Sequence, residues 1–322
     1  MAADVDDGER QLKVIGIFSK NNAQWVTIDL ACISADITSV TLYDTLGEQA
    51  TAFIINQCEL TTIFCTADKV QGLINLKKSG KVETLTSLVI MDKIKLADQL
   101  ATEEASLNII PFESLILGGY ESQRTLPDPS VDSIYTICYT SGTTGDPKGV
   151  MLNHMNLLCI GQGLDAVGVD INDSDVYISY LPLAHIMERA IMAVLVQRGG
   201  AVGFFQGDVL KLKEDLVELK PTIFVSVPRL FNRLFDGIQA RISEVKGFKK
   251  TLLNRGLKVK LNNLEGSGSQ TDSVYDKLVF NKFKEGLGGR VRFMLTGSAP
   301  ISKDVINFLK VAFCAPIFEG YG

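Results

Sequence analysis

The twelve residues Tyr139–Val150, YTSGTTGDPKGV, combine the residue types with which loops bind phosphate. Serine and threonine provide hydroxyl donors, and Lys148 provides a positive charge. Glycines permit positive φ values and a close backbone approach, so that several N–H groups can point at one anion. We therefore predict a phosphate-binding loop whose hydroxyl residues are Thr140, Ser141, Thr143 and Thr144 and whose glycines are Gly142, Gly145 and Gly149.

We expect this loop at the carboxyl end of a strand. Residues 134–138 have the apolar pattern of a buried strand, and a helix-like run begins at Asn153. Open α/β sheets bind their ligands at this edge. A Walker A loop is excluded, because it has Gly before its Lys and Ser or Thr after it, whereas Pro147 and Gly149 flank Lys148 here. The remaining alternative is a surface turn without chemical function, and the ordered motif favours phosphate binding over it.

Composition and charge exclude several classes of function. The chain has 322 residues, 46% of them hydrophobic, which is enough for one large or two ordinary domains. A net charge of −5 predicts no general attraction to nucleic acid or anionic membrane, so phosphate binding must be local. Six cysteines without a C-x-x-C pair indicate free thiols in a reducing, intracellular compartment. Two histidines are too few for a His-rich metal site, and no apolar run is long enough to span a bilayer.

Strand-like and helix-like segments alternate along most of the chain. Short apolar strands are predicted at 12–18, 61–65 and 87–91, with helical runs between them. These strands lack polar alternation, as expected where helices cover both faces of a sheet. The βαβ pattern predicts an α/β fold with mostly parallel, helix-flanked sheets.

We expect two halves within this fold, the first over about 12–132 and the second over about 133–322. A helical insertion is predicted at about 240–289, because this segment favours helix and is broken only by a Gly/Ser-rich linker. Its basic residues fit either an anionic lipid surface or a solvated helix face, and a solvated face is the more common case. They are Lys246, Lys249, Lys250, Arg255, Lys258 and Lys260.

Three later stretches resemble motifs of one enzyme superfamily. They are 180–189 (YLPLAHIMER), 221–233 (PTIFVSVPRLFNR) and 295–300 (LTGSAP). With the loop before them, they resemble, in order, the motifs of the adenylate-forming superfamily, which includes acyl-CoA synthetases, luciferases and the adenylation domains of peptide synthetases. Within it they are most similar to the long-chain fatty acyl-CoA synthetases. The resemblance covers nearly the whole chain and implies the large N-terminal part of such an enzyme.

This resemblance implies a ligase that uses ATP, Mg²⁺ and coenzyme A (CoA) and activates a long-chain fatty acid through an acyl-adenylate. His185 would lie beside the acyl and α-phosphate groups and, with Lys148, would be catalytic. No residue of the chain is predicted to bind the metal directly. Besides the loop, the residues that would contact the nucleotide are Gly297, Ser298, Ala299 and Pro300, followed by Gly320, Tyr321 and Gly322. The resemblance also allows peripheral contact with the endoplasmic reticulum or another organelle membrane.

The chain departs from the family pattern at its ends. The family motif that begins at Gly320 continues with Thr and with a Glu that helps to hold Mg²⁺, and a small C-terminal domain with a catalytic Lys follows. Neither is part of this sequence. We therefore expect a fragment of a long-chain ligase, whose own activity is an open question. The alternatives are an adenylating ligase for another carboxylic acid and a noncatalytic nucleotide-binding or interaction protein.

Overall fold

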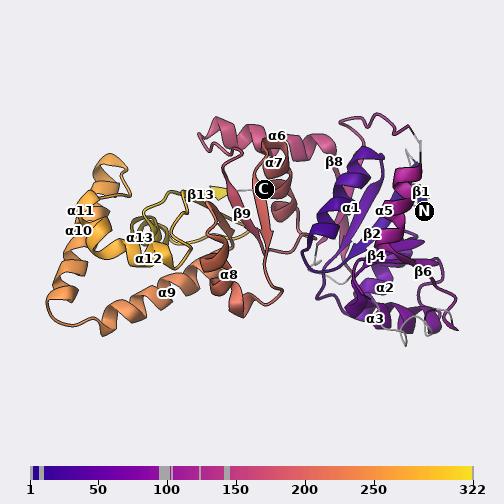
Figure 1. Ribbon diagram of the computed structural model, residues 1–322, viewed down its shortest axis with the longest axis horizontal. Helices are drawn as coiled ribbons and strands as arrows, with labels where there is room; N and C mark the ends of the chain where they lie inside the picture. The colour runs from indigo at the N-terminus through magenta and orange to yellow at the C-terminus, as the bar shows by residue number, and fades with distance from the viewer. Residues whose placement is uncertain are drawn as a thin grey trace. The chain divides into compact units, whose positions relative to one another are not determined.

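The computed structural model describes residues 3–6, 11–93, 102, 104–122, 125–140 and 146–320 (Figure 1). It divides into two units, each with its own β-sheet. The first unit comprises Met1–Asp170 and Leu181–Val194, and the second comprises Ile171–Tyr180 and Leu195–Gly322.

The first unit contains a mostly parallel sheet with the strand order β6-β5-β4-β2-β3-β7-β8. All neighbours from β6 to β7 are parallel, whereas β8 is antiparallel to β7, and β1 is antiparallel to β2 outside this order. This sheet confirms the predicted fold class. The strands are β1 (Ala3–Asp6), β2 (Gln11–Phe18), β3 (Thr38–Leu42), β4 (Thr62–Cys65), β5 (Ser87–Ile90), β6 (Asn108–Pro111), β7 (Ile134–Thr140) and β8 (Lys148–Asn153).

Helices cover both faces of this sheet, which explains why its central strands β3 and β7 are almost completely buried. On one face, Val40 and Ile137 belong to a buried cluster with side chains of α2 and α3. Successive strand residues point to opposite faces, and Ser39 and Thr136 contact α7 on the other face. The helices are α1 (Ala23–Ser34), α2 (Glu48–Gln57), α3 (Ala67–Lys78), α5 (Phe112–Glu121), α6 (His154–Ala166) and α7 (Ile186–Arg198).

The second unit contains a parallel sheet with the order β10-β9-β11-β12-β13. Phe224 of β11 lies at its centre, with its ring stacked on Tyr180 and in edge contact with Phe231. Its strands are β9 (Val176–Ser179), β10 (Ala201–Phe204), β11 (Ile223–Ser226), β12 (Phe293–Gly297) and β13 (Ile317–Gly320). Its helical segments are η1 (Val209–Lys211), α8 (Leu212–Leu219), α9 (Pro228–Glu244), α10 (Phe248–Ser267), α11 (Ser273–Tyr275), η2 (Asp276–Phe280), α12 (Asn281–Glu285) and α13 (Lys303–Phe313).

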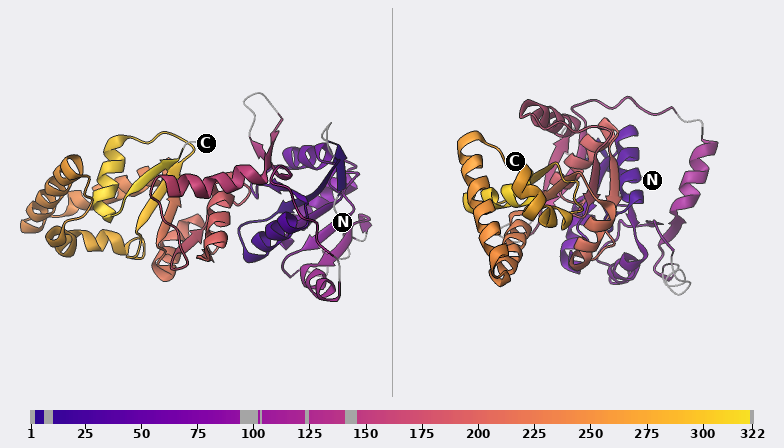
Figure 2. Two further views of the ribbon diagram at one scale, coloured as in Figure 1. Left: turned by 90° about the horizontal axis from the view of Figure 1, so that it is seen from above. Right: turned by 60° about the vertical axis from the view of Figure 1, so that its left-hand side comes forward.

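Within the second unit, α10 follows α9 after a sharp turn at one end of the unit (Figures 1 and 2). Phe235 of α9 packs edge-to-face on Phe308 of α13, with the ring centroids 5.0 Å apart. These helices lie in the segment where the sequence predicts a helical insertion.

The division of the structure differs from the boundary expected near residue 133. Strands β7 and β8 pair with β3 and with each other, so they extend the first sheet instead of starting the second. The division also passes through α7, after Val194. A boundary at 133 follows the polar connection before β7, but strand pairing places the division later in the chain.

None of the described helices is both long and apolar enough to cross a membrane.

All six cysteines are free thiols. Four of them are buried, Cys314 is half-buried, and Cys159 on α6 is exposed. Burial raises the pKa of Cys32, Cys58 and Cys65 above the ordinary thiol value.

Candidate functional site

The two ends of the predicted phosphate loop are held by the β7–β8 hairpin. In the antiparallel register, Thr140 lies opposite Lys148 and Tyr139 lies opposite Gly149. The hydroxyl of Thr140 donates to the Lys148 carbonyl at 3.5 Å. Lys148 itself is exposed. The central loop residues Ser141, Gly142, Thr143, Thr144 and Gly145 lie outside the described residues, so their contacts stay a prediction.

Strand β8 was not predicted, because the sequence pattern passes directly from the loop to a helix. The helix start itself is confirmed: Asn153 caps α6, and its side chain accepts a hydrogen bond from the Asn156 N–H at 2.9 Å. Most of β8 is exposed, so its residues show no apolar pattern that would indicate a strand.

Gly149 is small for a different reason from the one expected. It lies within β8, and it is not among the described residues with positive φ. A Cβ atom at this position would come within 2.9 Å of the Ile137 Cγ2 and 3.1 Å of the Tyr139 Cζ. Close packing between the strands, and not a positive φ, therefore explains the glycine at this position.

A pocket of about 850 Å³ lies at the carboxyl edge of the first sheet and brings two predicted groups together. Thr140, Asp146 and Pro147 from the loop ends line it together with His185. Lys148 is not among its lining residues. The remaining wall comes from the β3–α2 connection and the first turns of α2: Tyr43, Thr45, Leu46, Gly47, Gln49 and Ala50, with Tyr139 from β7.

This pocket is rich in hydrogen-bond donors. Among the described residues, its lining contains two phenols, two threonine hydroxyls, a glutamine amide, an imidazole and one carboxylate, that of Asp146. Burial raises the pKa of Tyr43 to about 12, so this phenol remains a neutral donor. Helix α2 also begins here, and its cap residue Gly47 makes no side-chain hydrogen bond to the first N–H groups. Such a lining suits an anion.

His185 lies immediately before α7, and a hydrogen bond from the backbone defines which of its two ring nitrogens carries the proton in the neutral form. Its Nδ1 accepts a hydrogen bond from the Met187 N–H at 3.2 Å, so the ring proton of a neutral imidazole lies on Nε2. Burial lowers the pKa of His185 below its ordinary value, which favours this neutral form. His185 can therefore donate its Nε2–H to an oxygen atom without carrying a charge.

A buried polar network that sequence reasoning missed fixes α7, the helix that follows His185. Arg189 of α7 forms an ion pair with Asp29 of α1 and donates to the Thr136 hydroxyl at 2.6 Å and to the Ser39 hydroxyl at 2.8 Å. The Arg189 guanidinium also lies 4.2 Å from the ring centroid of Tyr135. Its partners are 53 to 160 residues away in sequence, so no local pattern could reveal them.

The other histidine has a packing role. The His154 ring lies 5.6 Å from the ring of Tyr135, and burial lowers its pKa. It is not among the residues that line the pocket. Among the described residues, no group of three or more His, Cys, Asp or Glu side chains is arranged to hold a metal ion.

The predicted adenine segment lies at the carboxyl edge of the second sheet. Gly297 ends β12 and pairs in register with Gly320 at the end of β13. Ser298, Ala299 and Pro300 follow as exposed residues, and Ser298 has a φ of +71°. Pro300 is not part of a helix, since α13 begins at Lys303 with Ser302 as its cap. Tyr321 and Gly322 lie outside the described residues.

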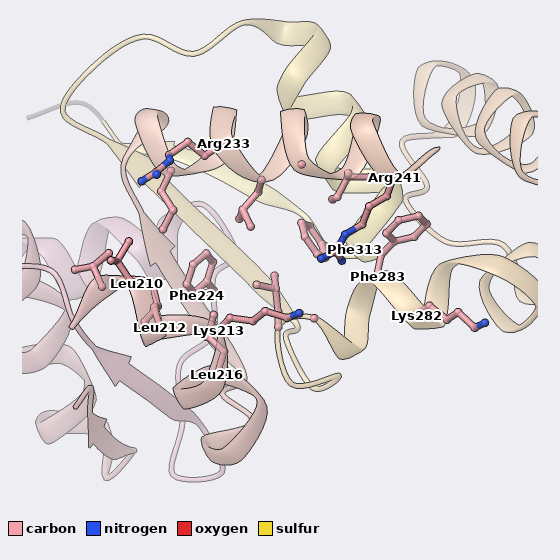
Figure 3. A pocket seen from close by; sticks show the side chains of 17 residues that line it. Leu210, Leu212, Lys213, Leu216, Phe224, Arg233, Arg241, Lys282, Phe283 and Phe313 are labelled. Atoms are coloured by element: carbon pink, nitrogen blue, oxygen red, sulfur yellow. The ribbon is translucent and has the colours of Figure 1, made fainter. Parts of the chain in front are cut away.

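A second pocket, of about 340 Å³, lies in the second unit between α8, α9, α12 and α13 (Figure 3). Phe224, Leu212 and Leu216 form part of its apolar lining. Cationic side chains also line it, among them Arg233 and Arg241 of α9. Sequence reasoning missed this pocket, because its lining residues come from five separate segments and carry no motif.

The model of the AMP-binding enzyme family matches residues 2–322 of the chain. Among curated proteins, the chain is 41% identical over 308 residues to the peroxisomal long chain acyl-CoA synthetase 6 of Arabidopsis thaliana, covering 96% of the chain and 43% of that protein. It is 39% identical over 318 residues to long-chain-fatty-acid–CoA ligase 5 of Mus musculus, covering 97% of the chain and 46% of that protein. The chain thus spans less than half the length of these relatives.

Solved structures show the same fold at lower identity. The adenylation domain of a carboxylate reductase from Mycobacterium chelonae matches with a TM-score of 0.77 and 20% identity, over 98% of the chain and 47% of that protein. A luciferase-like enzyme from the mealworm Zophobas morio matches with a TM-score of 0.65 and 17% identity, over 96% of the chain and 59% of that protein.

Proposed function

Since the chain belongs to the AMP-binding enzyme family, we propose that it is the adenylating part of a long-chain fatty acid–CoA ligase. The overall reaction joins a fatty acid to CoA and converts ATP to AMP and diphosphate. The observation that carries the proposal is the pocket that His185 lines together with Thr140, Asp146 and Pro147 from the ends of the phosphate loop. The names of the two curated relatives supply the substrate class.

The donors of the first unit suit the adenylation step. The fatty acid carboxylate attacks the α-phosphorus of ATP, a P–O bond forms, and the bond to diphosphate breaks. We assign the Nε2–H of His185 to a carboxylate or α-phosphate oxygen, and Thr140, Ser141, Gly142, Thr143, Thr144, Gly145 and Lys148 to the phosphates. Fixed donors of this kind stabilise charge that develops in the transition state. In the second step, the CoA sulfur attacks the acyl carbon and AMP leaves.

The donor set also bears on Mg²⁺. Among the described residues, the pocket contains one carboxylate, and Mg²⁺ in nucleotide sites is bound largely by phosphate oxygens and water. We therefore propose that the ion binds together with ATP and reduces the negative charge of the phosphates. We further propose that Gly297, Ser298, Ala299 and Pro300 border the adenine with Gly320, Tyr321 and Gly322.

For the pocket of the second unit, taken by itself, we propose an apolar ligand such as an aliphatic chain. Its leucine and phenylalanine side chains would bury methylene groups, each of which contributes about 0.8 kcal/mol when removed from water. Its volume of about 340 Å³ is within the usual range of ligand pockets.

The free thiols fit a reducing intracellular compartment, and we propose peripheral association with the endoplasmic reticulum or another organelle membrane.

The test is the exchange of labelled diphosphate into ATP by the 322-residue chain, with palmitate, acetate or an amino acid as the acid. The proposal expects exchange with palmitate and much less with acetate. His185→Gln should lower the exchange about 100-fold, because one transition-state donor is lost. His154→Gln is the matched control and should leave exchange unchanged.

Other outcomes decide between the alternatives. Exchange with acetate or an amino acid, but not with palmitate, would indicate an adenylating ligase for another acid. No exchange from a folded sample that still binds ATP would indicate a noncatalytic nucleotide-binding protein.

A further inference from the structure

The turn between α9 and α10 carries an exposed aromatic residue among lysines. Phe248, the first residue of α10, is 80% exposed. Lys246, Lys249 and Lys250 are its neighbours in sequence, and all three are exposed. Gly247 joins the two helices with a φ of +64°, and a Cβ there would meet no atom within 4 Å. We call residues 246–250 the basic tip.

The positive charge continues along one side of α10. Arg255 and Lys258 are exposed, and they lie seven and ten residues after Phe248, so the three share one face of the helix. No acidic residue occurs between Glu244 and Glu265. Among the described residues, the five exposed cations of this surface take part in no ion pair. The surface is therefore strongly basic in a chain whose net charge is −5.

The opposite side of α10 is firmly attached to the unit, which fixes the direction of the basic face. Lys260 is fully buried and donates to the Asp276 carboxylate at 2.5 Å and to the Val311 carbonyl at 2.6 Å. A Cβ at Gly256 would come within 2.8 Å of the Tyr275 ring, so helix and ring are in close contact. Because these residues fix the inner face, the helix cannot rotate to cover Phe248.

We propose that the basic tip and the exposed face of α10 bind the surface of an anionic lipid bilayer. Lysines bind the phosphate headgroups while their aliphatic stems cover apolar surface, and an aromatic ring inserts at the headgroup boundary. Phe248 is a single exposed ring at the turn between two helices, and a bilayer is the partner that buries such a ring without a pocket of its own. Nucleic acid would use the same cations but would leave the ring without a defined role, and the overall negative charge opposes it.

The inference rests on the peripheral membrane association proposed above and assigns a surface to it, but it does not depend on adenylation, because none of these residues lines the donor-rich pocket. The inference also decides between the two interpretations of the basic residues, which are a solvated helix face and a face that binds anionic lipid. The sequence alone favours a solvated helix face, whereas the exposure of Phe248 and the lack of ion pairs favour a membrane.

The test is co-sedimentation of the 322-residue chain with phosphatidylcholine vesicles that contain none or about 30% phosphatidylserine. The chain should bind only the anionic vesicles, and binding should weaken as salt rises. Each lysine near an anionic surface adds about fivefold to the affinity, so K246Q/K249Q/K250Q should weaken binding by about 100-fold. The matched control K81Q/K93Q/K303Q removes three exposed lysines elsewhere and should bind as the parent chain does.

A second measurement tests the aromatic residue. In Phe248→Trp, the new indole should shift its emission to shorter wavelengths with anionic vesicles and be quenched by brominated lipid. Trp25, the only native tryptophan, is 1% exposed and should show neither change.

Three results would overturn the proposal. One is equal loss of vesicle binding in the tip and control variants, which would indicate unspecific charge attraction. Another is an unchanged emission of Phe248→Trp on vesicles. The third is tip-dependent binding of a short DNA or RNA duplex without vesicle binding, which would identify a nucleic acid as the partner.

Discussion

Arg189 in the first unit and Lys260 in the second are both buried cations, but their surroundings differ. Arg189 is 1% exposed, and its fork contacts Asp29, Thr136 and Ser39 on three separate elements. Lys260 is 0% exposed and contacts one carboxylate, one carbonyl and the Cys314 sulfur. Five guanidinium donors can join several elements at once, whereas an ammonium group is a compact charge with three donors.

The comparison shows what each cation fixes. Arg189 joins α1, β3 and β7 to the helix that follows His185, so it supports the donor-rich pocket. Lys260 joins α10 to η2 and α13, so it supports the helix that carries the basic tip. The side chains of the two carboxylate partners differ little in exposure, 10% for Asp29 and 17% for Asp276, so the main difference is the number of groups that each cation contacts. Removing each cation should therefore have consequences of different size.

The largest effect is expected for Arg189→Met. The substitution leaves the Asp29 charge buried without its partner, which costs about 3–5 kcal/mol of unfolding free energy. Urea denaturation followed by the fluorescence of Trp25 measures it, because the Arg189 guanidinium lies 5.3 Å from that ring. The double variant Asp29→Leu/Arg189→Met should recover part of the loss. If it recovers none, the network stabilises by its shape and not by its charge.

A smaller effect is expected for Lys260→Met, about 2 kcal/mol, the usual range for hydrogen bonds to charged groups. Water can reach the partly exposed Asp276 carboxylate, which limits the cost. Chemical denaturation followed by circular dichroism gives the value, with Lys258→Met, an exposed neighbour on the same helix, as the control. If Lys260→Met lost as much unfolding free energy as Arg189→Met, the two buried cations would not differ in their contribution to stability.

The smallest effect is the dependence of stability on pH, which we expect from the two histidines of the first unit. Burial lowers the pKa values of His185 and His154, so the unfolded chain binds more protons than the folded one just below pH 6.5. The folded chain should therefore keep its full stability above pH 6.5. Its free energy of unfolding should decrease as the pH falls from 6.5 through the lowered pKa values of the two histidines. Protonation of His185 Nδ1 would also break its bond to the Met187 N–H. The measurement is melting temperature against pH for the parent chain and for His185→Gln and His154→Gln.

Each single variant should remove the part of the decrease in melting temperature at low pH that its own histidine causes. Since the chain has only these two histidines, the double variant should be nearly independent of pH between about 5 and 7. An unchanged pH dependence in the double variant would assign the effect to carboxylates instead.

The parts of the fold that could be predicted are those governed by local burial. Strands β2, β4 and β5 are predominantly apolar, as expected where helices cover both faces, and they were found from that pattern alone. Strand β8 is exposed, so it left no such pattern. His185 was found through its motif, but its Nδ1 contact and the supporting ion pair of Arg189 depend on tertiary structure. The apolar pocket of the second unit depends on five segments and was equally out of reach.

The six cysteines differ in exposure, so their reactivity can be used to detect local unfolding at several places in the chain. Cys159 is exposed and should react with a thiol reagent at once, giving one defined position for a spectroscopic label. Cys32, Cys58, Cys65 and Cys138 are buried and can react only when the structure around them opens. Their alkylation rates, resolved by mass spectrometry, would rank the opening free energies around α1, α2, β4 and β7 without any substitution.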